Sequence, residues 1–312
     1  MEAMIVMNKI IRYWNQNRKQ IVIIIAIIAF IIILIQIVNS LLKNTTNSNQ
    51  MNENTSKVQD VTKSNQSTIT GQEVSKSTTE QNANIIKNFV EYCNNSNIQK
   101  AYELLSDNCK EEFENNINSF ANNYHSKIFK TKKVYNLDFL SSESNLYTYK
   151  ITYYEDNLLS TGGKTTTNNF EDYITIVNQN GEVKINVGSF IKKSNINKSQ
   201  NSNNIQITVN NKKVYRSYEI YNVTIKNGTQ NTIKLSNGQN SKDICLVDKN
   251  GVEYPSLINE IPIHLLSLGA GKQISINVKF NKVYETYRKI EKMQFGNITL
   301  NQESNIKILI NI

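Results

Sequence analysis

The chain has 312 residues, a formal net charge of +9, three cysteines and two histidines. No two cysteines have a CxxC spacing, so we expect neither a zinc site nor another metal centre. About 230 residues follow an apolar and then a polar N-terminal stretch, which is enough for two domains of ordinary size.

The first predicted element is a membrane-spanning helix over residues 21–38, whose sequence IVIIIAIIAFIIILIQIV contains no charge. A helix of this length spans about 27 Å, close to the hydrocarbon thickness of a bilayer. A buried soluble helix is the alternative. Because positive residues precede the segment, we expect residues 1–20 in the cytoplasm and the rest of the chain outside. These positive residues are Lys9, Arg12, Arg18 and Lys19.

A cleaved signal peptide is another interpretation of residues 21–38. The following sequence QIVNSLLK offers no pair of small residues for cleavage, so we predict an uncleaved signal anchor. Residues 39–83 are mostly Asn, Ser, Thr, Gln and Lys. Such a composition cannot bury enough apolar surface to offset the entropy lost on ordering, so it predicts a disordered tether.

The spacing of apolar residues changes within the next segment, residues 84–192. Up to about Tyr124 they recur every three or four positions, which predicts three helices, and beyond it they alternate with polar residues, which predicts antiparallel strands. Helices followed by a curved sheet would form an α+β domain. The helical faces are Ile85, Ile86, Phe89, Val90 and Cys93, then Ala101, Tyr102 and Leu105, then Phe113, Ile117, Phe120, Ala121 and Tyr124.

A polar stretch, SNINKSQNSNN at residues 194–204, predicts a boundary. Beyond it several segments alternate apolar and polar residues, for example 205–209, 221–225, 274–280 and 306–312. Asn-Gly pairs between these segments are signals for turns between strands. We therefore expect an all-β sandwich over residues 203–312.

One stretch, STGGKTTT at residues 160–167, looks like the end of a phosphate-binding loop. That loop requires a glycine where this chain has Leu158, and a helix where this chain has the strand-like FEDYITIV. We therefore predict a hairpin tip, with Gly162 and Gly163 in the turn, and no bound nucleotide or other cofactor.

A family resemblance rests on the motifs FVEYCNNSNIQKAYELLSDNCK, FANNYHSKIF, NLLSTG, EDYITIV and KINVGSFI. This region resembles the nuclear transport factor 2-like superfamily, as found in membrane-anchored proteins of Gram-positive bacteria. The following YRSYEIYNVTIKN, DICLVDKNGVEYPS and ISINVKF resemble an immunoglobulin-like module. The resemblance implies a cone of helices on a curved sheet with a pocket at its open end. Such domains include small enzymes, binding modules and an assembly factor of secretion and conjugation channels.

Candidate chemistry is sparse in the predicted cone. His125 beside Glu155 or Asp172 would be an acid–base pair, and the alternative is a histidine that caps a helix end. Cys93 and Cys109 could form a disulfide outside the cell, or be small buried residues. The possible pocket residues are Tyr124, His125, Tyr147, Tyr149 and Tyr153, although tyrosines in strands more often serve packing.

The charge distribution gives a further clue. Residues 84–192 contain 11 Lys and 13 Asp and Glu, a net of −2, and residues 193–312 contain 16 Lys and Arg and 8 Asp and Glu, a net of +8. Outside a bacterial cell the anionic partners for such a surface are wall polymers and lipid headgroups. We expect no nucleic acid, since no recognition motif is present. The possible anionic-surface patch is Lys212, Lys213, Arg216, Lys282, Arg288, Lys289 and Lys292.

Together these patterns favour a non-enzymatic, single-pass, membrane-anchored binding or assembly protein of the bacterial cell envelope. Its partners would be the lipid bilayer through residues 21–38, and envelope proteins or anionic wall polymer outside. A component of a conjugation or type IV secretion-like channel is one alternative, and a small enzyme that uses the cone pocket is another.

Overall fold

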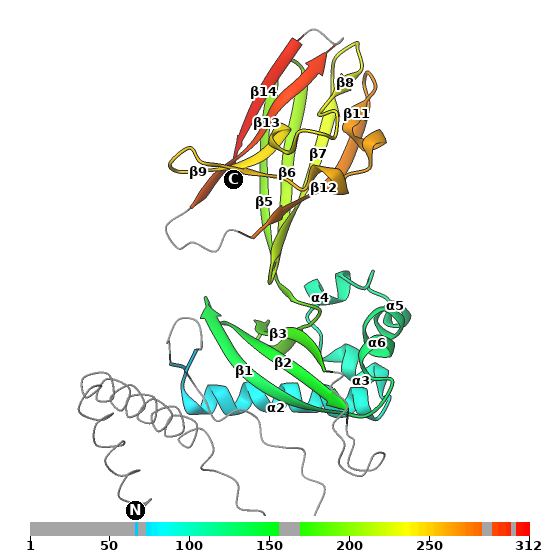
Figure 1. Cartoon of the computed structure of the whole chain (residues 1–312), viewed down its shortest axis with the longest axis vertical. Coiled ribbons are helices and arrows are strands. Elements are labelled where there is room, and N and C mark those ends of the chain that lie inside the picture. Colours follow the sequence, from blue (N-terminus) through cyan, green and yellow to red (C-terminus); the bar gives the residue numbers. More distant parts are fainter. Residues whose placement is uncertain (1–65, 68–72, 156–168, 283–288, 301–303) are drawn as a thin grey trace, which may run out of the picture. The chain divides into compact units, whose positions relative to one another are not determined.

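The computed structural model describes residues 66–67, 73–155, 169–282, 289–300 and 304–312 (Figure 1). The predicted membrane span 21–38, most of the predicted tether and the predicted hairpin tip at 160–167 lie outside these residues. Among the described residues no helix is both long enough and apolar enough to cross a membrane.

Helix α2, Lys76–Asn94, begins inside the segment predicted to be a tether. The Ser75 side chain caps its start by accepting a hydrogen bond from the Thr78 N–H at 3.1 Å. Four of the five residues of the apolar face expected from the sequence are buried, with Ile86 and Phe89 fully inaccessible to solvent, and the fifth, Ile85, is half-buried. The helix lies along the first sheet (Figure 1).

The second and third helices expected from the sequence are broken into short pieces. Side chains of Asn97, Ser106 and Asn116 accept hydrogen bonds from nearby N–H groups and start a new turn each time. Asn and Ser bond readily to local backbone, which favours helix starts and turns over helix interiors. The pieces are α3 (Ile98–Glu103), α4 (Asp107–Glu111), α5 (Ile117–Phe120), the π-helix η1 (Ala121–His125) and α6 (Ser126–Ile128).

The first sheet is antiparallel, with strand order β1-β2-β3-β4. Its inner face and α2 enclose the first hydrophobic core, which includes Phe120, Leu137, Ile151, Ile174 and Ile185. The strands are β1 (Lys133–Glu143), β2 (Leu146–Glu155), β3 (Phe170–Gln179) and β4 (Glu182–Asn186).

Two further antiparallel sheets contribute to a second hydrophobic core. One has the order β12-β7-β6-β5, and the other has the order β10-β9-β13-β8-β11 with β14 paired to β13. The strands are β5 (Phe190–Ser202), β6 (Ile205–Tyr215), β7 (Tyr218–Asn227), β8 (Ile233–Lys234), β9 (Ile244–Asp248), β10 (Glu253–Pro255), β11 (Ser267–Leu268), β12 (Gln273–Asn281), β13 (Ile290–Leu300) and β14 (Ser304–Asn311). Short 3-10 turns η2 (Ser241–Asp243), η3 (Ile258–Glu260) and η4 (Ile263–Leu266) lie between strands.

The polar stretch predicted to be a boundary is part of a long hairpin instead. Strand β5 pairs with β6 from Phe190 opposite Tyr215 to Ser202 opposite Ile205. The turn between them places Asn203 and Asn204 at φ 52° and 59°, the left-handed conformation that a two-residue hairpin turn of this kind requires. One end of this hairpin belongs to the first core and the other end to the second.

The fold class expected from the sequence is therefore wrong for this chain. Described residues are mostly in several antiparallel sheets, and only α2 is a long helix. They do not form a nuclear transport factor 2-like cone of three helices on one sheet followed by an immunoglobulin-like module. The physical reasons are the repeated capping by Asn and Ser, which shortens the helices, and the long pairing of β5 with β6.

Candidate functional site

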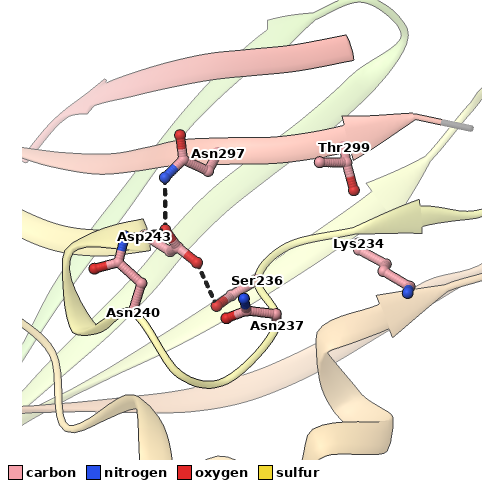
Figure 2. A pocket seen from close by; sticks show the side chains of 7 residues that line it. All are labelled: Lys234, Ser236, Asn237, Asn240, Asp243, Asn297 and Thr299. Atoms are coloured by element: carbon pink, nitrogen blue, oxygen red, sulfur yellow. Dashed lines mark hydrogen bonds between the residues drawn. The ribbon is translucent and has the colours of Figure 1, made fainter. Parts of the chain in front are cut away.

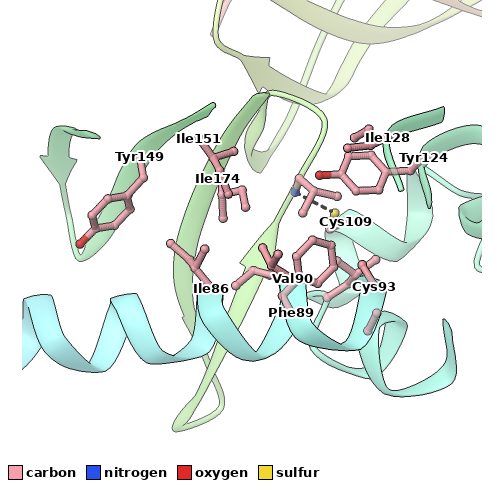
Figure 3. Close-up of a cluster of buried hydrophobic side chains, with 14 of the residues drawn as sticks. Ile86, Phe89, Val90, Cys93, Cys109, Tyr124, Ile128, Tyr149, Ile151 and Ile174 are labelled. Atoms are coloured by element: carbon pink, nitrogen blue, oxygen red, sulfur yellow. Dashed lines mark hydrogen bonds between the residues drawn. The ribbon is translucent and has the colours of Figure 1, made fainter. Parts of the chain in front are cut away.

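The tyrosine and carboxylate candidates meet at a buried cluster in the first core. The Tyr124 hydroxyl donates to Asp172 Oδ2 at 2.8 Å, and the exposed fractions of the two residues are 5% and 4%. Tyr124 comes from η1, a π-helical turn, which is a conformation often found at functional sites. Figure 3 shows Tyr124 among the side chains of this core.

Asp172 also holds the turn that leads into β5. Its carboxylate accepts hydrogen bonds from the backbone N–H groups of Gly188 and Ser189, each at 3.0 Å, and of Tyr173 at 2.7 Å. Gly188 and Ser189 have φ of 67° and 65°, so this turn is left-handed. Burial raises the pKa of Asp172, and the hydrogen bonds from Tyr124, Gly188, Tyr173 and Ser189 oppose that rise. The carboxylate thus joins η1 to β3 and to the turn after β4.

The structure does not join His125 to a carboxylate. Its Nε2 atom lies 2.8 Å from the backbone oxygen of Cys93, and its ring stacks on Phe129 with centroids 5.5 Å apart. Glu155 is paired instead with Lys133 at 3.5 Å. The two residues proposed as an acid–base pair with His125 therefore have other partners.

The remaining pocket candidates on β2 are packing residues to different degrees. Tyr149 is buried, accepts a hydrogen bond from Asn82 at 3.1 Å and packs on Phe139. Tyr153 is fully buried, and burial, followed by the nearby Asp172 charge, raises the pKa of its hydroxyl far above the usual value. Tyr147 is only half-buried. Within the described core these tyrosines fill space against the helices.

All three cysteines are free and buried, so Cys93 and Cys109 are not bridged. The Cys109 sulfur accepts a hydrogen bond from the Val187 N–H at 3.4 Å, which Figure 3 marks with a dashed line. Burial raises the pKa of Cys109 to about 12 and that of Cys245 to about 11.

The basic residues predicted to form one anionic-surface patch are divided among different partners. Lys213 pairs with Glu112 at 2.7 Å. Lys212 pairs with Glu219 at 3.7 Å and lies over the Tyr221 ring. Part of the positive charge of β6 is thus balanced by carboxylates of the same chain.

Other members of the predicted patch are further along the chain. Arg216 lies over the Tyr173 ring at 5.4 Å. Lys282 is half-buried, and burial lowers its pKa although Glu219 opposes that change. Lys289 is exposed just before β13, and Lys292 is half-buried within that strand. Arg288 lies outside the described residues.

Sequence reasoning missed a polar cavity of about 230 Å³ beside the second core. Figure 2 shows its side chains, which come from β8, from the loop that follows β8, from η2 and from β13. The only signal in the sequence was the Asn-rich run NGQNSKD, which also fits an ordinary turn. The lining residues are Lys234, Ser236, Asn237, Asn240, Asp243, Asn297 and Thr299.

Asp243 fixes three side chains around this cavity. Its carboxylate accepts from Ser236 Oγ at 2.6 Å, from Asn240 Nδ2 at 2.9 Å and from Asn297 Nδ2 at 2.6 Å. The exposed fraction of Asp243 is only 4%, and its bond to Ser236 is buried, whereas Asn240 and Asn297 are exposed side chains that reach it from the surface. The shared carboxylate thus holds the side chains of Ser236, Asn240 and Asn297 beside one another at the cavity. Among the described residues no group of three or more His, Cys, Asp or Glu is arranged to hold a metal ion.

Comparisons with known proteins add little to this geometry. No family model and no curated protein matches the sequence. One solved structure, a conserved hypothetical protein from Bacillus anthracis, is 18% identical with a TM-score of 0.25. The match covers 38% of this chain and 96% of that chain. A likeness this weak supports no argument about fold or function.

Proposed function

We propose that this chain is a non-enzymatic binding protein of the bacterial cell envelope, with the residues beyond the apolar run at 21–38 located outside the membrane. The observation that carries the proposal is the polar cavity, in which Asp243 holds neighbouring side chains in place. Polar groups held in fixed positions give a ligand site its orientation and specificity, and this cavity presents such groups without an apolar residue among the described residues that line it.

The bonding of the candidate catalytic residues also supports a binding role. Asp172 receives four hydrogen bonds from within the fold, from one side chain and three backbone N–H groups. His125 bonds to a backbone oxygen. A general acid or base must reach a substrate proton, whereas these two groups hold the fold together.

Crosslinking in intact cells tests the proposal. The tagged full chain is treated with a membrane-impermeant crosslinker, and the attached material is identified by mass spectrometry and by sugar analysis. Capture of wall polymer or of defined envelope proteins is expected, and proteins of a transfer channel would identify the machine. If nothing from the envelope is captured at physiological salt, the proposal is wrong.

A labelling experiment tests the location separately. Gln200 is exposed on β5, so a Gln200→Cys variant presents an accessible thiol. The three natural cysteines are buried and give little background. Labelling of this variant in intact cells by an impermeant maleimide is expected, with wild type as the control. Labelling only after cell lysis would place this part of the chain in the cytoplasm.

A further inference from the structure

The cavity lies at a break in the pairing of one strand. Strand β13 pairs with β9 as far as Phe295, opposite Ile244, and pairs with β8 from Thr299, opposite Lys234. Asn297 lies between these two stretches, where the loop after β8 leaves the sheet. On its other edge β13 is irregular against β14 between Phe295 and Ile298, and bulges often occur beside functional sites because they redirect a side chain.

The hydrogen bonds within the lining determine which donor and acceptor atoms remain free to bind a ligand. Asn240 and Asn297 each use one amide donor on Asp243, and the Asn237 carbonyl oxygen accepts from the Gln239 N–H. Among the described residues no protein group pairs with the Lys234 ammonium, the Thr299 hydroxyl or the Asn237 amide nitrogen. The cavity therefore offers several neutral donors and acceptors beside one cation.

Both oxygens of Asp243 are already bonded to side chains, so its carboxylate offers no open acceptor position to a ligand, although its negative charge remains beside the cavity. Of the two charged lining residues, only Lys234 presents its charge to a ligand, because its ammonium is exposed. No lining residue is aromatic, so the site has no platform for stacking a flat ring. This combination favours hydroxyl groups with an anion over a cation or a nucleobase.

The volume limits the size of the ligand. A cavity of about 230 Å³ holds roughly eight water molecules at about 30 Å³ each. This is room for one small ring or a short polyol. Resting on the proposed binding function, we propose that the cavity binds a single sugar or polyol unit that carries one acidic group, with Lys234 on the anion and with Asn237 and Thr299 on hydroxyls.

Calorimetric titration of the purified full chain in detergent tests this inference. The probes are D-glucuronate, glycerol 1-phosphate and methyl glucoside, so that a carboxylate source, a phosphate source and a neutral sugar are compared. At least one acidic probe should bind about tenfold more tightly than methyl glucoside, since a charge-assisted bond is worth roughly this factor. Binding of glucuronate alone would identify a sugar acid, and binding of glycerol phosphate alone would identify a polyol phosphate.

Two variants outside the Asp243 network test the assignment of residues. Lys234→Gln should weaken binding of the acidic probe about tenfold, and the isosteric Thr299→Val about fivefold. Lys272→Gln, at an exposed lysine before β12, is the matched control and should have no effect. Absence of binding by every probe, or equal binding by wild type and both variants, would overturn the inference. If the Lys234→Gln variant still captured envelope material in the crosslinking experiment, the proposed function would stand although the assignment of the cavity ligand had failed.

Discussion

The bond between Tyr124 and Asp172 makes the sharpest test of how the first core is held together. Tyr124→Phe removes one hydroxyl and keeps the ring, which stacks on Phe120 with centroids 5.6 Å apart. Asp172 retains its three backbone donors. The change therefore isolates one hydrogen bond to a buried carboxylate.

The size of the effect follows from the burial of both partners. Hydrogen bonds to charged groups contribute about 1.5–3 kcal/mol to stability, and this one is 2.8 Å long and largely shielded from water. We expect the free energy of unfolding to fall by about 2 kcal/mol. Tyr154→Phe is the matched control, because its hydroxyl is 3.4 Å from Asn136 at a side chain that is 37% exposed. That variant should stay within about 0.5 kcal/mol of wild type.

Urea unfolding followed by far-ultraviolet circular dichroism measures these free energies. Hydrogen exchange with mass spectrometry adds a local readout, since the amides of Gly188 and Ser189 depend on the same carboxylate. Tyr124→Phe should speed exchange in the peptide that contains them, and Tyr154→Phe should not. If Tyr124→Phe were no less stable than Tyr154→Phe, the carboxylate would not be the link we describe.

The pH dependence of this variant has a definite sign. Burial raises the pKa of Asp172 in the folded state, so between the unfolded and folded values the native protein binds more protons. The contribution of Asp172 to the free energy of unfolding is then greatest at low pH and declines as the pH rises through the pKa of the folded state. The hydrogen bond from Tyr124 favours the ionised carboxylate of Asp172. The loss of unfolding free energy caused by Tyr124→Phe should therefore be largest at neutral pH. It should shrink as the pH falls and Asp172 becomes protonated.

Three further predictions concern other parts of the structure. Glu112→Gln should lower the free energy of unfolding by about 1–2 kcal/mol. In a double-mutant cycle with Lys213→Met, the effects of the two substitutions should be coupled, because the two side chains form a pair at 2.7 Å. Additive effects would contradict the pair. Asp243→Ala should lower the free energy of unfolding by about 1–2 kcal/mol in urea unfolding, because the buried Ser236 hydroxyl loses its acceptor while the exposed Asn240 and Asn297 amides can bond to water. A loss below about 0.5 kcal/mol would show that the Asp243 bonds contribute little to stability. The three natural thiols should react with maleimide only after unfolding, because a buried thiol with a raised pKa is rarely present as the reactive thiolate. Fast labelling of the folded chain would contradict their burial.

Some of the fold follows from periodicity in the sequence. The spacing of Ile86, Phe89, Val90 and Cys93 correctly marked the buried face of α2. Alternation at residues 205–209, 221–225, 274–280 and 306–312 marked segments of β6, β7, β12 and β14. These elements each bury one regular face, which is the condition under which periodicity is informative.

Elements without a regular buried face could not be predicted in this way. Most of β5 beyond Asn195 is exposed, so its side chains carry no alternation, and its pairing comes from the register of β6. The broken helices depend on local capping by Asn and Ser, which competes closely with helix continuation. Both errors led to the wrong fold class.

The candidate site was hidden for a different reason. The charge imbalance between 84–192 and 193–312 is visible in the sequence, but the sequence does not tell which carboxylate meets which lysine. Glu112 and Lys213 are brought together only by the tertiary fold. Asn237 and Asn240 resemble ordinary turn residues until Asp243 and Asn297 are seen beside them.

The β5–β6 hairpin has a mechanical consequence. Phe190 and Tyr215 at one end belong to the first core, and Ile205 and Ile207 near the other end belong to the second. Tension between the two cores would therefore be carried by the backbones of β5 and β6 together, which the hydrogen bonds between them keep in register. A flexible linker would stretch first under the same load and leave each core undisturbed. Here the connection itself is paired structure, so a pull on one core is transmitted to the other before either unfolds.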